Sequence, residues 1–126
     1  MTVYAGVAQS DPVVSKITMS GPFYASTTNN ITAKAGGGQT GGSPMLTDLN
    51  LVTVCATIGD SVTLPTAEAG REVTVANLGA ASLNVFPNTG DKVNAGVANA
   101  AYALAAGKAA TFYGAGPLQW VALLSA

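Results

Sequence analysis

Residues 71–86 read REVTVANLGAASLNVF and contain two short runs in which apolar and polar side chains alternate, Val-Thr-Val and Leu-Asn-Val. Alternation with a period of two is typical of a β-strand that buries one face. Asn77 and Gly79 lie between the runs, and both residue types tolerate the positive φ of tight hairpin turns. We therefore expect a β-hairpin with strands at residues 71–76 and 82–86.

Similar runs recur through residues 45–126, separated by glycine, asparagine, aspartate and proline. Closely spaced short strands predict an all-β fold, and we expect a small antiparallel β-sandwich or barrel of jelly-roll-like form. The alanine-rich residues 95–110 are interrupted by two glycines, so we expect one helical turn there at most. We find no internal repeat. The expected strands are residues 51–55, 61–64, 71–76, 82–86, 100–104, 108–113 and 118–124.

The N-terminal part of the chain has a different composition. Residues 36–43 read GGGQTGGS, which is typical of a flexible linker. The residues before them hold two short β-like runs, 13–19 and 30–33, and too few large apolar side chains for a core. We therefore expect an extended N-terminal arm over residues 1–43 and a folded module over residues 44–126.

Ordering such an arm costs roughly 1–2 kcal/mol of backbone entropy per residue, and contact with a partner must offset that cost. We expect residues 13–19 to add a strand to an exposed sheet edge of a capsid or neighbouring subunit. Two aromatic residues that follow a Gly-Pro turn would anchor the arm in a pocket, or pack within an oligomer. The residues assigned to partner binding are Val13, Val14, Ile17, Met19, Phe23 and Tyr24.

The last expected strand, residues 118–124, is apolar on both faces, which indicates cover on both sides. The module can cover one face, and we expect a second copy of the chain to cover the other. Charged residues make up 9% of the chain, against about 25% in typical soluble domains. So weakly charged a surface favours self-association. The residues assigned to the oligomer interface are Leu118, Trp120, Val121 and Leu123.

Side chains that usually carry catalysis are scarce. The chain has no histidine and one cysteine, so the commonest general base, the commonest metal ligand and any internal disulfide are missing. Cys55 lies in an expected strand without basic neighbours, where a buried, unreactive thiol is expected. Glu68 and Glu72 flank a turn, and solvated turn residues are expected rather than a catalytic pair. We expect no enzymatic activity, no cofactor and no bound metal.

Charge and hydropathy also exclude two classes of partner. The 5 lysine and arginine residues form no cluster that would bind phosphates, so we expect no nucleic-acid partner. No stretch approaches the roughly 18 consecutive apolar residues of a membrane span, and the N-terminal residues lack a signal-peptide pattern. We expect folding in a reducing cytoplasm and no membrane partner. Most aromatic side chains should be core, with a sugar-binding platform as the alternative: Phe86, Tyr102, Phe112, Tyr113 and Trp120.

Six segments together resemble a small β module of tailed-bacteriophage structural proteins, including head-decoration (cement) proteins and fibre components. The likeness covers residues 50–124 and leaves the arm outside. It implies a role on the particle surface and often a trimeric state, and it carries no catalytic residues. The segments are residues 60–65 (DSVTLP), 69–79 (AGREVTVANLG), 83–87 (LNVFP), 90–94 (GDKVN), 104–108 (LAAGK) and 120–121 (WV).

We therefore expect a capsid decoration protein on the virion surface, assembled in the host cytoplasm. As a homotrimer, it would bind the major capsid protein and bridge neighbouring subunits of the head. The alternative is a fibre or spike module that recognises a host-surface glycan or receptor. Such a module usually needs a shaft, and the apparent lack of repeats favours decoration. A small enzyme is the third and least favoured of the candidate functions.

Overall fold

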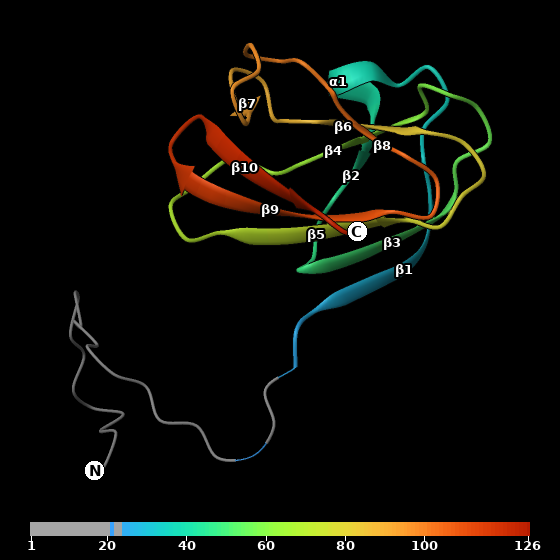
Figure 1. Cartoon of the computed structure of the whole chain (residues 1–126), viewed down its shortest axis with the longest axis horizontal. Coiled ribbons are helices and arrows are strands. Elements are labelled where there is room, and N and C mark those ends of the chain that lie inside the picture. Colours follow the sequence, from blue (N-terminus) through green and yellow to red (C-terminus); the bar gives the residue numbers. More distant parts are fainter. Residues whose placement is uncertain (1–20, 22–23) are drawn as a thin grey trace, which may run out of the picture.

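Strands dominate the computed structural model, which describes Gly21 and residues 24–126 and confirms the all-β class (Figure 1). Its one helix in these residues, α1 (Gly38–Gly41), has a single turn, so no described helix is long and apolar enough to cross a membrane. Five residues assigned to partner binding, Val13, Val14, Ile17, Met19 and Phe23, lie outside the described residues. The sixth, Tyr24, is exposed.

Two sheets face each other across the core. The larger has the order β1-β3-β5-β9-β10-β7 and the smaller has the order β2-β4-β6-β8. The larger sheet contains β1 (Thr27–Thr32), β3 (Leu49–Val54), β5 (Glu72–Asn77), β7 (Lys92–Val93), β9 (Ala109–Gly116) and β10 (Gln119–Leu124). The smaller contains β2 (Ser43–Pro44), β4 (Ser61–Thr63), β6 (Leu83–Phe86) and β8 (Tyr102–Leu104). All seven strands expected in residues 45–126 are present.

The pairing is mixed, and the expected antiparallel pairing holds only in the C-terminal part. From β1 to β6 the chain alternates between the sheets, so β1, β3 and β5 pair in parallel, as do β2, β4 and β6. This path is that of a short β-solenoid with three stacked coils. Strands β8 and β9 then run antiparallel to β6 and β5, and β10 runs antiparallel to β9.

The expected hairpin of residues 71–86 is wrong, because β5 and β6 lie in different sheets. Residues 78–82 form an arch between them, held by the buried side chain of Asn77. Its Nδ2 donates to the carbonyl oxygens of Ala81 (2.8 Å) and Leu104 (2.9 Å), and its Oδ1 accepts from the Gly79 amide (3.0 Å). Alternation identified both strands but not their partners.

The expected boundary at residue 44 is also wrong. Strand β1 pairs with β3, and Ala33 is buried in the core with 4% of its surface exposed. Lys34 pairs with Ser61 through reciprocal backbone hydrogen bonds of 2.9 and 3.0 Å. Residues 27–43 therefore belong to the folded module.

The glycine-rich residues 36–43 pack against β4 instead of forming a free linker. Ser61 Oγ donates to the Gly38 carbonyl (3.1 Å), and Thr63 Oγ1 donates to the Gln39 carbonyl (2.6 Å). A Cβ atom at Gly42 would lie 2.6 Å from Thr63 Oγ1. Glycine is needed here because the backbone approaches β4 closely.

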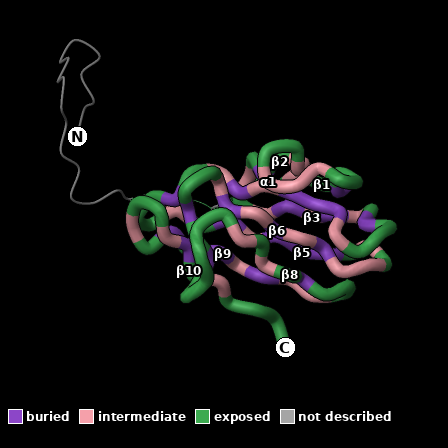
Figure 2. Tube along the Cα trace, turned by 90° about the horizontal axis from the view of Figure 1, so that it is seen from above, coloured by how far each residue is buried: buried purple, intermediate pink, exposed green. Residues whose placement is uncertain are grey.

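The core is built from the alternate side chains that both sheets turn inward, and buried segments lie along β3, β5 and β9 (Figure 2). The rings of Tyr102 and Phe112 meet edge to face with centroids 5.4 Å apart. Residues 95–110, all described, contain β8 and no helix. The largest fully buried side chains are Trp120, Phe112, Met45, Leu64, Leu83 and Leu104.

A pair of truncations tests where the module begins. A chain that starts at Tyr24 keeps every described strand and should retain β-rich circular dichroism and a cooperative melt. A chain that starts at Pro44 loses β1, α1 and the buried Ala33, and should unfold at a clearly lower temperature or fail to fold. Equal melting temperatures for the two chains would contradict the structure.

Candidate assembly surface

The outer face of the larger sheet is the candidate functional surface. Cross-strand register aligns Leu49, Thr74, Thr111 and Leu123 in one row across β3, β5, β9 and β10. These residues alternate with the buried ones, so their side chains point away from the core. We call the following set the assembly face: Leu49, Leu51, Glu72, Thr74, Ala109, Thr111, Tyr113, Val121 and Leu123.

Strand β10 has the two apolar faces that its sequence predicts. Val121 and Leu123 point outward and are 39% and 59% exposed. Trp120 points inward with none of its surface exposed, so its assignment to an oligomer interface is wrong. Its complete burial also rules out a sugar-binding platform at this indole. Leu118 is exposed, but it precedes β10 in a turn with φ of 68° and lies outside the assembly face.

The assembly face carries little charge. Glu72 is its one charged side chain, and it stands where β5 begins. The hydroxyls of Thr74 and Thr111 hydrogen-bond to each other at 2.9 Å. Tyr113 contributes an exposed ring beside Val121, its cross-strand partner. The surface therefore suits a protein partner that can bury aliphatic and aromatic side chains.

The outer face of the smaller sheet is different because α1 packs over it (Figure 1). Gln39, within α1, donates from Nε2 to the Pro87 carbonyl (2.9 Å) and to Asn99 Oδ1 (3.0 Å). These bonds tie the helix to the loops that follow β6 and β7. Helix α1 contacts β4 and β6, whereas no described helix contacts a strand of the larger sheet at a comparable level.

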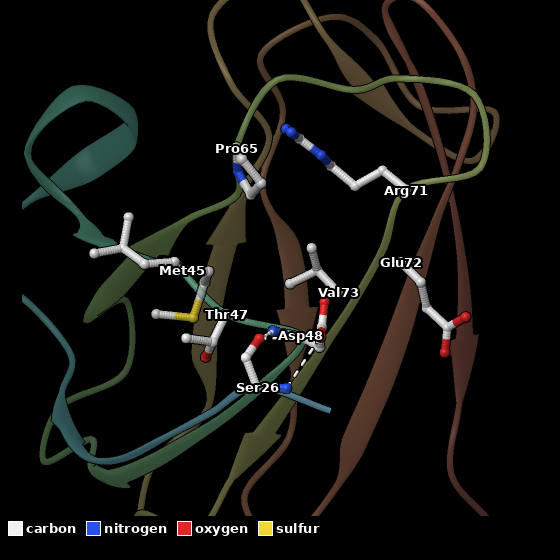
Figure 3. Close-up of a pocket in the computed structure, with 9 residues that line it drawn as sticks. Ser26, Met45, Thr47, Asp48, Pro65, Arg71, Glu72 and Val73 are labelled. Atoms are coloured by element: carbon white, nitrogen blue, oxygen red, sulfur yellow. Dashed lines mark hydrogen bonds between the residues drawn. The ribbon is translucent and has the colours of Figure 1, made fainter. Parts of the chain in front are cut away.

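A shallow pocket of about 250 Å³ lies beside the first residues of β3 and β5 (Figure 3). Asp48 Oδ2 accepts hydrogen bonds from the Ser26 amide (3.1 Å) and hydroxyl (3.0 Å). Arg71 donates to the Thr66 carbonyl (2.8 Å) and pairs with Glu68 at 3.6 Å. Arg71 and Glu72 point away from each other. These charged groups support loops, and none forms a convergent acid–base pair.

The two buried acids also shape turns. Asp60 Oδ2 accepts from the amides of Ala56 and Thr57, both at 3.1 Å, and so closes the arch between β3 and β4. Asp91 Oδ2 accepts from the Ala67 amide at 2.8 Å, while its Oδ1 has no partner among the described residues. The described residues contain no group of three or more histidine, cysteine, aspartate or glutamate side chains that could hold a metal.

Cys55, at the end of β3, is buried with 1% of its surface exposed. Burial raises the pKa of its thiol, and the negative charge of Asp60 raises it further. The thiol is therefore protonated at neutral pH and poorly placed to act as a nucleophile.

Comparison with protein-family models, with curated proteins and with solved structures finds no match for this chain.

Trp120→Ala tests the burial of the indole. It should lower the free energy of unfolding by about 3–5 kcal/mol, because it leaves a cavity in the core. Val121→Ala, one residue along on the outer face, is the matched control and should change it by about 0.5 kcal/mol. Chemical denaturation measures both. Equal effects would contradict the burial of the indole.

Cys55 should make stability depend on pH in the alkaline range. Because its pKa is raised in the folded state, its contribution is complete below the unfolded thiol pKa of about 8.5 and is lost as pH rises through the folded value. Denaturation at pH 7 to 10 should show stability falling as pH rises, and Cys55→Ala should reduce that dependence on pH.

Ellman's reagent should label the native Cys55 thiol slowly and the denatured thiol fast. Rapid native labelling would contradict the burial.

Proposed function

We propose that this protein is a non-enzymatic decoration protein of a tailed-bacteriophage head. It binds the major capsid protein on the outer surface of the virion and bridges neighbouring capsid subunits. The observation that carries the proposal is the uncovered, nearly uncharged assembly face. Because burying apolar surface is favourable by roughly 25 cal/mol per Å², this face gains most from contact with another protein.

The size of the face supports binding by several copies at once. Four strands about 4.8 Å apart and about 20 Å long cover roughly 400 Å². A stable interface buries about 800 Å² per partner, so a single copy would bind weakly. A homotrimer presents three such faces and gains affinity through avidity. A ligand that binds only the intact shell then stabilises it by mass action, without any chemistry.

A fibre or spike module that recognises a host-surface glycan or receptor is the second candidate. The parallel stacking of three coils favours it, because coils of this kind can continue along one axis to build a shaft. Counting copies on purified virions separates the two functions. Hundreds of copies support decoration, and a few dozen or fewer support a fibre.

Charge on the assembly face should abolish shell binding. In the variant Val121→Asp with Leu123→Asp, binding would bury two carboxylates in an apolar contact, so occupancy of undecorated heads should fall at least about tenfold. Val97→Asp is the control, because Val97 is 74% exposed in the loop between β7 and β8, outside the assembly face. Sedimentation with heads measures occupancy. Full binding by a folded double variant would refute the proposed face.

A further inference from the structure

Two arches stack along the side of the solenoid where β3 and β5 end, on the right in Figure 1. Cys55 of the first arch accepts backbone hydrogen bonds from Ala80 (3.1 Å) and Ala81 (3.0 Å) of the second. The Gly59 amide also donates to the Ser82 carbonyl at 3.3 Å. These bonds hold the two arches together as one firm edge.

Exposed aliphatic side chains gather along this edge. Val54, Ile58 and Leu78 are 47%, 80% and 56% exposed, and we call these three residues the arch ridge. Lys34 and Lys108 lie at the same end, in the arch after β1 and just before β9. Lys108 Nζ donates to the Ala126 carbonyl oxygen at 2.6 Å. The nearby Asp60 is buried in its arch, so the ionic side chains that reach the surface here are the exposed Lys34 and the half-buried Lys108.

The opposite side of the same coils, where β3 and β5 begin, is acidic. A groove of about 550 Å³ lies beside the first residues of β3 and β5, on a floor that includes alanine and glycine. Asp48, Glu68 and Glu72 line it with a single cation, Arg71. Lys92 is also near this end, but it lies on β7, at the far edge of the sheet from β3. Three carboxylates against one guanidinium leave the groove acidic.

We propose that the arch ridge of one copy docks in the acidic groove of the next copy. Ile58 and Leu78 would cover the alanine and glycine floor, and the lysines would face the groove carboxylates. The burial of the ridge supplies affinity, and the charges set orientation and the rate of association. The surfaces are different patches on one chain, so the contact is heterologous and closes into a ring when the rotation between copies permits.

This contact between copies goes beyond the proposed binding to a shell and needs no shell to form. A ring of three would be the trimer proposed above. Glu72 lies where the groove borders the assembly face, and the rest of that face stays open for the capsid. Sheet-to-sheet packing of two assembly faces is the competing arrangement. It would be isologous and would leave the arch ridge and the acidic groove exposed.

Reciprocal charge reversal tests the contact. The ridge variant carries Lys34→Glu and Lys108→Glu, and the groove variant carries Glu68→Lys and Glu72→Lys. Each variant alone has two ends of like charge, so its self-association should weaken at least about tenfold relative to the parent chain. A chain that carries all four substitutions should associate again, because its acidic ridge then meets a basic groove on the next copy. Sedimentation velocity on the full chain at low salt measures all three samples.

Two further variants separate the ridge from the rest of the surface. Ile58→Asp should weaken association of the parent chain, whereas Val97→Asp should not; thermal melts confirm that each is folded. A parent chain that stays monomeric at micromolar concentration would overturn the inference, as would a chain with all four substitutions that stays dissociated. The variant Val121→Asp with Leu123→Asp should still self-associate. Its failure to bind heads therefore reports on the proposed function separately.

Discussion

Gly79 lies directly against the backbone of Cys55, and this contact sets the spacing of successive coils. A Cβ atom at Gly79 would lie 2.5 Å from the Cys55 amide nitrogen, so any larger residue would push the two arches apart. The side chain of Asn77 supplies the remaining polar contacts of the corner. With the arches held at this distance, β3 pairs with β5, β4 pairs with β6, and the inward side chains fill one core.

Strand positions could be predicted from the sequence, but strand partners could not. Alternation along residues 71–86 is local and shows which residues turn inward. Parallel pairing between coils joins residues 19 to 25 positions apart, such as Leu49 and Thr74, and leaves no local signal. The sequence predicted Gly79 as a turn residue, whereas glycine is needed there because the backbone packs closely against Cys55. The two-residue strands β2 and β7 are too short to show any period.

Part of the assembly face was also visible in the sequence. Val121 and Leu123 were predicted to lie at an oligomer interface, because β10 is apolar on both faces, which a strand covered on only one side would not need. Tyr113 was interpreted as core, although its neighbour Phe112 takes the inward position and period-two alternation places Tyr113 outside. Glu72 and Thr74 were not assigned to any surface site from the sequence, because only the pairing of β5 with β9 brings them beside Tyr113 and Thr111. A face made from several strands emerges only once their order is known.

A small apolar face on a chain whose two ends differ in charge would give several copies an affinity that one copy lacks. In the proposed function, the larger sheet lies against a capsid. A reconstruction of decorated heads tests this most directly. It should show the outer face of β5, β9 and β10 buried on the shell, with Val121 and Leu123 at the contact. Density that places this face toward solvent, with another surface on the shell, would contradict the account.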